Sequence, residues 1–312
     1  VTDSGANTII GQGSGSSLIS IGGGSNNTSV GQGNFNSLIT GSNNTTIGQG
    51  NATGLVGGSY NVIIGQGAGT SLTTENNNVL LNMTGAAGIS GFLCLGMKFR
   101  GVSGPFMHNW PGDSSSNGSN FFAGWGCGNF SLGATDVANT GFGQEALLNI
   151  APTAIGNTVV GFEAMRLMTT GKRNTVIGSS AGFNSGGGTG ITTGSDNILI
   201  GINAGDNYTG DESGNILIGL MGVLGESNKT KIAGIRGATT TNNDAIAVLI
   251  DSAGQLGTVS SSIRTKENVV DMGDDSNRLM QLRPVSFSYK AYPGGKEYGL
   301  IGEEVEETFP EL

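Results

Sequence analysis

Charged and aromatic side chains are scarce in this chain of 312 residues, at 12 % and 6 % of the composition. A globular domain normally carries about 25 % charged residues. Glycine, with 58 residues, lies well above its usual share of about 7 %. Because glycine loses much entropy on ordering and large side chains are few, one copy is not expected to bury a deep core of its own. The composition favours either disorder or stacked repeats that share a core with neighbouring repeats or sister chains.

Further absences exclude several classes of function. There is one histidine, His108, and there are two isolated cysteines, Cys94 and Cys127. The paired ligand spacings of zinc motifs are therefore absent, and we expect no metal and no cofactor. The two cysteines are consistent with a disulfide in an oxidising compartment or with two buried thiols. No apolar stretch approaches the ~20 residues of a membrane span, and a net charge of −9 without a basic patch argues against a nucleic-acid partner.

A repeated motif of aliphatic residues followed by glycine runs along the chain. IIGQG at 9–13 recurs as SVGQG at 29–33, TIGQG at 46–50 and IIGQG at 63–67, and later as NTVIG at 174–178 and NILIG at 197–201 and 215–219. Each copy predicts a short strand closed by a glycine turn. A spacing of about ten to twenty residues is typical of a β-solenoid or an interleaved β-prism. Disorder would scatter the aliphatic residues, whereas here they precede glycine in phase.

Two segments depart from this motif. Within 134–170, the runs EALLNI and FEAMRLM have helical character and predict short helical turns or corners. The segment 92–130 gathers Trp110, Trp125, His108, both cysteines and several phenylalanines. One interpretation is a lateral pocket in which Trp110, Trp125 and His108 contact a glycan or receptor. The other is a local core where the solenoid changes width or handedness.

The composition changes abruptly after Ser260. Up to that residue the chain holds 53 of its 58 glycines and 21 charged residues, and after it come 16 charged residues and five glycines. Two kinds of protein are joined here, so we expect two functions. The predicted divisions are a repeat region at 1–91, an aromatic insertion or wide rung at 92–133, a second repeat region at 134–231, a linker with the last rungs at 232–260, and a terminal domain, cut short, at 261–312. Since the chain begins within a repeat, we expect it to be a fragment.

The terminal segment carries three specific motifs. They are Ser-x-x-Arg-x-Lys-x-Asn from Ser261, LRPVSFSY at 282–289 and GLIGEEV at 299–305. Over 232–312 the sequence resembles the intramolecular chaperone domain of phage and giant-virus fibres, which also ends endosialidase tailspikes and is an autoprocessing serine peptidase. The upstream repeats resemble, more loosely, the heads of trimeric autotransporter adhesins.

This resemblance implies a self-cleaving serine peptidase that acts in cis and needs no external substrate. Ser261 would be the nucleophile, Lys266 the general base and Ser260–Ser261 the scissile bond. A lysine can act as base only if burial or a cationic neighbour keeps its amine neutral. Ser262 and Ser260 remain alternative nucleophiles.

Arg264 and Asn268 are the expected supporting residues of the same motif. Arg264 lies two residues before the lysine and is placed to contribute a positive field. The family domain continues into a further strand and a long helix, whereas this chain stops at Leu312.

The expected fold is therefore mainly β, a fibrous homotrimer of glycine-rich β-solenoid or β-prism repeats followed by a small α/β chaperone domain. Ile177, Ile200 and Ile218 are expected to face a shared or per-chain core. In the terminal domain we expect short helices over 275–281 and 302–308 and a strand over 284–289.

Three functions remain open. The leading one is an extracellular structural or adhesive fibre of a virion or cell surface, which attaches to a host glycan or receptor without inserting into a membrane. A tailspike that degrades or binds polysaccharide is the alternative, and it would need paired carboxylates on one face. The third is a membrane-tethered regulator released by self-cleavage.

Overall fold

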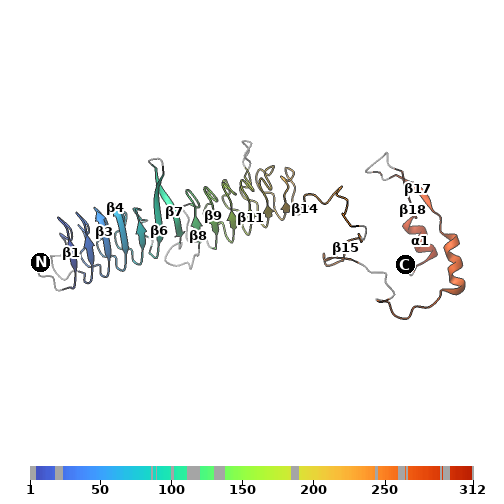
Figure 1. Cartoon of the computed structure of the whole chain (residues 1–312), viewed down its shortest axis with the longest axis horizontal. Coiled ribbons are helices and arrows are strands. Elements are labelled where there is room, and N and C mark those ends of the chain that lie inside the picture. The colour runs from blue at the N-terminus through green and yellow to red at the C-terminus, as the bar shows by residue number, and fades with distance from the viewer. Residues whose placement is uncertain are drawn as a thin grey trace. The chain divides into compact units, whose positions relative to one another are not determined.

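The computed structural model divides the chain into two compact units, Val1–Ala238 and Thr239–Leu312. It describes residues 5–17, 24–85, 87–88, 90–99, 102–110, 120–129, 138–183, 190–242, 245–258, 264, 266–288, 290 and 296–310. Figure 1 shows the first unit as a regular ladder of short strands and the second as separate small elements. No helix in these ranges has the length and apolar character needed to span a membrane.

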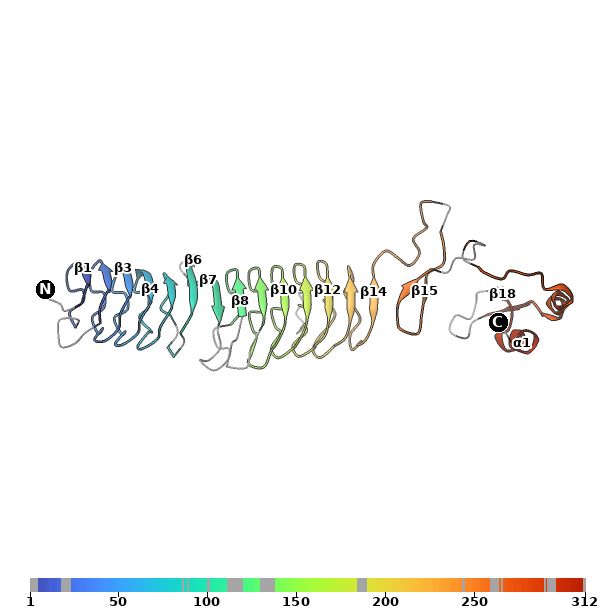
Figure 2. The same ribbon diagram turned by 90° about the horizontal axis from the view of Figure 1, so that it is seen from below.

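The first unit is a solenoid built on one sheet of fourteen strands that follow each other in chain order (Figures 1 and 2). The strands are β1 (Thr8–Ile10), β2 (Thr28–Val30), β3 (Thr45–Gln49), β4 (Val62–Gln66), β5 (Val79–Leu81), β6 (Leu93–Phe99), β7 (Val102–Trp110), β8 (Asn120–Ala123), β9 (Thr140–Phe142), β10 (Thr158–Val160), β11 (Thr175–Ile177), β12 (Ile198–Ile200), β13 (Ile216–Ile218) and β14 (Thr230–Ile232). Consecutive strands pair in parallel, as in β3 with β4, so each coil stacks on the one before it. The mainly β solenoid predicted from the repeats is confirmed.

The parallel ladder is interrupted by a hairpin in the aromatic segment. Strand β6 pairs with β7 in antiparallel fashion, with a register shift between Leu95 and Gly96, and β7 pairs with β8 in the same way. Strand β8 then pairs in parallel with β9, and the regular stacking resumes. Figure 1 shows this hairpin rising beyond the edge of the neighbouring coils.

A ladder of buried asparagines joins one coil to the next. In the coil before β3, the backbone N–H and the side-chain Nδ2 of Asn44 both donate to Oδ1 of Asn27, each at 3.0 Å. The same Nδ2 donates to the carbonyl of Gly58 at 2.8 Å. Buried polar groups must be hydrogen-bonded, and each asparagine here satisfies groups of two coils. The ladder residues are Asn27, Asn44, Asn61, Asn78, Asn120, Asn139, Asn157, Asn174, Asn197 and Asn215, all at most 2 % exposed.

Among the described residues, the one before a ladder asparagine has a left-handed backbone. Its φ is 59° at Asn43, 54° at Arg173 and 61° at Asp196, while Gly156 and Gly214 occupy the same place in other coils. Asparagine, aspartate and glycine tolerate this conformation best, which explains the turn residues that precede each strand.

In most of the regular coils, the glycine after the apolar strand residues is required by the close approach of the next coil. Gly48 has a φ of +133°, and a Cβ there would lie 1.7 Å from the carbonyl oxygen of Gly65. At Gly161, with a φ of +148°, a Cβ would lie 2.1 Å from the carbonyl oxygen of Gly178. The aliphatic-glycine motif therefore marks the point where successive backbones touch.

The segments EALLNI and FEAMRLM form corners but not helical turns, so that part of the prediction is wrong. Glu145 and Leu147 have φ values of 57° and 54°, and Glu163 and Met165 have values of 54° and 45°. A right-handed helix requires negative φ at every residue. Their apolar residues recur at helical spacing because Leu147 and Ile150 point inward from one corner, and Met165 and Met168 from the next, all with 0 % exposure.

The core of the solenoid is one side chain wide at each strand. The central residue points inward, as in Val176, Leu199 and Leu217, which are fully buried. The third residue points outward, so Ile177, Ile200 and Ile218 are 45 %, 36 % and 37 % exposed. Because side chains alternate along a strand, both sets cannot face one interior. The expectation that these isoleucines face a core within the chain is therefore wrong.

The second unit consists of small elements. They are β15 (Leu249–Ile250) paired with β16 (Leu256–Gly257), the 3₁₀ helix η2 (Gly273–Gln281), β17 (Val285–Phe287) paired with β18 (Glu297–Gly299), and α1 (Gly302–Thr308). The expected helix over 302–308 is confirmed, and that over 275–281 is a 3₁₀ helix. Within the described part of this unit, Phe309 is the single buried residue.

Candidate functional site

The residues expected at the cleavage site lie in a segment that the structure covers in part. Ser260, Ser261 and Ser262 are outside the described residues. Lys266 and Arg264 are both exposed, and Asn268 is exposed with a left-handed φ of 54°. The geometry between nucleophile and base therefore stays a prediction from the motif.

The 3₁₀ helix η2 contacts the end of α1 and the residue after it. Nε of Arg278, on η2, donates to the carbonyl oxygen of Thr308 at 2.8 Å, and its guanidinium lies 4.4 Å above the ring of Phe309. This cation–π contact covers Phe309, which is 2 % exposed. Sequence reasoning missed the contact between Arg278 and Thr308, because two residues thirty positions apart form no local pattern.

A second arginine ties the strand motif to α1. Arg283 forms an ion pair with the carboxylate of Glu304, in which Nε donates to Oε2 at 3.2 Å. The hydrogen bond from Arg283 holds the pKa of Glu304 below its usual range. Both side chains are exposed, so this pair orients the helix more than it stabilises it.

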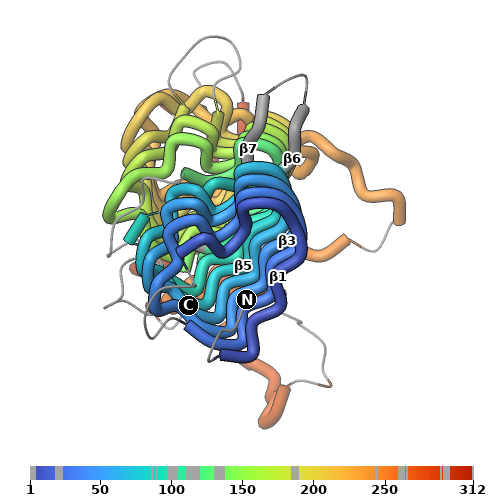
Figure 3. Tube along the Cα trace, turned by 90° about the vertical axis from the view of Figure 1, so that its left-hand side faces the viewer, coloured from blue at the N-terminus to red at the C-terminus, as the bar shows by residue number. Residues whose placement is uncertain are grey.

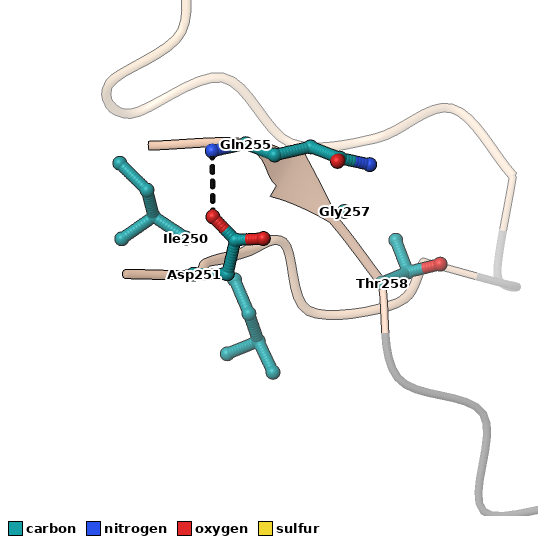
Figure 4. A pocket seen from close by; sticks show the side chains of 6 residues that line it. Ile250, Asp251, Gln255, Gly257 and Thr258 are labelled. Atoms are coloured by element: carbon teal, nitrogen blue, oxygen red, sulfur yellow. Dashed lines mark hydrogen bonds between the residues drawn. The ribbon is translucent and has the colours of Figure 1, made fainter. Parts of the chain in front are cut away.

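The hairpin of β15 and β16, shown in Figure 4, immediately precedes the predicted cleavage site. Oδ1 of Asp251 accepts hydrogen bonds from the backbone N–H groups of Ala253 at 2.9 Å and Gln255 at 2.8 Å, which closes the turn. An open depression beside it is lined by Leu249, Ile250, Asp251, Gln255, Gly257 and Thr258. The carboxylate of Asp251 is hydrogen-bonded within its own turn, and the walls of the depression are mostly apolar. The depression is therefore better suited to packing against another apolar surface than to catalysis.

The aromatic segment forms a core around His108. This side chain is 1 % exposed, its Nε2 lies 3.0 Å from the carbonyl oxygen of Cys127, and its ring centroid is 5.1 Å from that of Phe122. Burial lowers the pKa of His108 to about 4, so the imidazole is neutral at physiological pH. His108 therefore packs in the solenoid and is out of reach of an external ligand.

The other residues of this segment divide between surface and interior. Trp125 is half-buried, and the side chain of Trp110 lies outside the described residues. Cys94 and Cys127 are free, buried thiols, and burial raises the pKa of each to about 12. The exposed aromatic residues are instead Phe106 and Phe121, at 45 % and 40 %.

Two buried glutamates hold the corners of two short coils. The carboxylate of Glu75 accepts backbone N–H groups of Thr74 at 2.9 Å and Gly88 at 2.5 Å. That of Glu212 accepts those of Gly210 and Gly225, each at 3.0 Å. Sequence reasoning missed these two glutamates, although their position could have revealed them. Each glutamate lies three residues before a ladder asparagine, and several other coils have glycine at that position.

Replacing Glu212 by Gln is expected to lower the free energy of unfolding at neutral pH. The variant should then lose less stability on acidification than the unchanged chain. Burial raises the pKa of Glu212, but the backbone hydrogen bonds outweigh it and hold the pKa below its ordinary 4.5. A depressed carboxyl stabilises the fold above its unfolded pKa, and this stabilisation is lost as pH falls through the folded value. Urea midpoints between pH 7 and pH 3 measure this effect, and equal acid sensitivity of the variant and the unchanged chain would contradict it.

With the geometry described, comparison with known proteins adds one finding. Residues 261–312 match the family described as chaperone of endosialidase. The match covers the charged terminal segment that begins at the compositional change after Ser260. No curated protein and no solved structure matches the chain. A chaperone-type terminal segment that follows a β-solenoid is the arrangement expected of a tail-fibre or endosialidase-type protein.

Proposed function

We propose that this chain is the subunit of a trimeric extracellular fibre whose terminal domain guides assembly and then cuts itself off between Ser260 and Ser261. The family match at 261–312 supports a chaperone role for that domain. The solenoid supports a structural role for the rest. We further propose an adhesive role on a virion or cell surface, with a host glycan or receptor as partner.

The observation that supports the assembly role is the exposure of large apolar side chains among the described residues of the second unit. Ile246, Ile250 and Leu256 are 67 %, 68 % and 69 % exposed, and Val270 and Met280 are 83 % and 89 % exposed. Burying an aliphatic side chain of this size contributes about 1.5–3 kcal/mol, so leaving these in water forgoes most of the driving force for folding. Association of three copies would supply the missing interior.

Coupling of the cut to assembly follows from the position of Lys266. This lysine is exposed in the single chain, and burial is what favours the neutral amine that a general base requires. Packing of sister chains around it would create that environment. The peptidase would therefore act only on chains that have assembled.

The proposed reaction is an acyl shift followed by hydrolysis. The hydroxyl oxygen of Ser261 attacks the carbonyl carbon of Ser260 while Lys266 takes the hydroxyl proton. The peptide C–N bond breaks, its nitrogen receives a proton and becomes the free amine of Ser261, and an ester joins the two residues. Water then hydrolyses the ester and restores the hydroxyl. After the assembly domain is lost, an unfolded fibre cannot readily refold. Unfolding is then irreversible, and the rate of unfolding sets the stability of the fibre.

The proposal is tested by following freshly produced full-length chain with native mass measurement and amino-terminal sequencing. We expect particles of three copies, followed by a small fragment whose first residue is Ser261. A stable single copy would overturn the assembly role. A trimer with a new terminus elsewhere would overturn the assigned bond but leave the assembly role in place.

The polysaccharide-degrading alternative gains no support from the acidic residues of the second repeat region. Glu145 and Glu163 lie on successive coils, but Arg166 contacts both, with Nε at 2.6 Å and 3.7 Å. The guanidinium of Arg166 also lies 5.6 Å from the ring centroid of Phe183. These contacts describe an ion-pair cluster that braces the corners, so we propose no hydrolase activity there.

A further inference from the structure

The outer face of the solenoid sheet carries two rows of side chains, from the first and third positions of strands β1–β5 and β9–β14. The third-position row includes Ile10, Val30, Ile47, Phe142 and Ile232, which are between 37 % and 58 % exposed. The first-position row includes Val62, Val79 and Ile198, at 37–38 % exposure, and threonines in other strands. Figure 2 shows the strands of both repeat regions arranged along one face.

No charged residue lies in either row on strands β1–β5 and β9–β14. The chain as a whole has a net charge of −9, and identical chains that approach through this face bring no charged side chains of these two rows together. Parallel sheets are almost always covered on both faces, and their strands are apolar on both. The inner face is covered by the chain's own corners, whereas the outer face has no cover from the described residues.

The spacing of the rows indicates what covers them. Each row repeats once per coil over the length of the unit, so a partner must present a surface with the same repeat. Another copy of the same solenoid does so in register. Eleven regular strands with two outward positions each give 22 side chains, within the ~20–30 residues per side of a stable interface.

We propose that this outer face, the first- and third-position rows of the sheet, is the surface through which sister solenoids pack in the fibre. The inference rests on the proposed trimer and names the face that forms it. After the terminal domain is cut away, this contact holds the solenoids together.

The border of the face differs between the two repeat regions. In the first, the position after the glycine is glutamine, and Gln32, Gln49 and Gln66 form an exposed ladder with side-chain hydrogen bonds of 3.1 Å and 3.4 Å. In the second, Phe162 and Ile202 occupy this position and are 47 % and 75 % exposed. The apolar surface is therefore wider in the second region, which should contribute more to the contact.

Thiol labelling of the assembled full-length chain tests the proposal. Ile47→Cys and Ile177→Cys place a thiol in the third-position row, and Ile39→Cys places one on another side of the coil. Ile39 and Ile47 are both 43 % exposed in the single chain, so they are matched controls. The native thiols Cys94 and Cys127 are buried and protonated, so a maleimide reports the introduced one.

We expect Ile39→Cys to label fully while Ile47→Cys and Ile177→Cys stay protected until the protein is denatured. Equal labelling of all three variants in particles that still have the mass of three copies would show that this face is not the contact surface. The proposed trimer itself would not be contradicted. Equal labelling in particles of one copy would overturn both. As a second measurement, Ile177→Asp should lower the trimeric fraction, whereas Ile39→Asp should not, and equal trimeric fractions would contradict the proposal.

Discussion

Ser261→Ala is expected to leave the full-length chain uncut and still trimeric. Removing the hydroxyl removes the proposed nucleophile, so cleavage should fall by roughly 10³-fold or more. Assembly depends on packing and should not change, because a single hydroxyl contributes little to it. Denaturing electrophoresis for the cut and native mass for the assembly measure the two effects separately.

The neighbouring serines supply matched controls for this variant. Ser262→Ala and Ser260→Ala make the same chemical change one residue away, and both should be cut at the same bond. Lys266→Ala should behave like Ser261→Ala, because the serine then lacks its base. Normal cutting of Ser261→Ala would show that Ser261 is not the nucleophile, and loss of cutting in Ser262→Ala alone would show that the nucleophile is assigned one residue too early.

Asn157→Ala is expected to produce a large loss of stability in the solenoid. Asn157 is fully buried, donates to Oδ1 of Asn139 at 2.9 Å and to the carbonyl of Gly171 at 2.9 Å, and accepts from the backbone and side chain of Asn174 at 3.1 Å and 3.0 Å. Alanine leaves these groups buried without their partner, and each such group costs about 1–3 kcal/mol. We therefore expect a loss of about 4 kcal/mol or more in the free energy of unfolding.

The control for this variant is Asn149→Ala, which makes the same substitution at an exposed corner. Its effect should stay within about 0.5 kcal/mol, as for most surface changes. Urea unfolding of both variants, uncut and at the same protein concentration, gives the comparison. Similar midpoints for the two would show that the ladder is structurally neutral.

The amino-acid sequence predicted the repeating part of this fold well. A short run of β-branched or aliphatic residues before glycine, as in Thr175–Ile177 before Gly178, encodes a short strand and a tight step to the next coil, because glycine allows the close backbone approach. The charged residues after Ser260 marked a second kind of domain, and the family match begins at Ser261. The assignment of Ser261 and Lys266 came from a motif and not from geometry, so it remains a prediction.

The sequence could not decide which apolar side chains face inward or what satisfies the buried polar groups. A strand such as Val176 and Ile177 within an all-apolar run has no polar alternation, so the inward residue is fixed only when the coil closes around it. Helical spacing at Leu147 and Met165 arose from left-handed corners, which sequence periodicity does not distinguish from a helix. The burial of His108 and the contact of Arg278 with Phe309 depend on segments brought together by folding. Local patterns thus determined the strands and turns, and tertiary stacking decided which faces were buried, because burial depends on neighbours that lie a coil away.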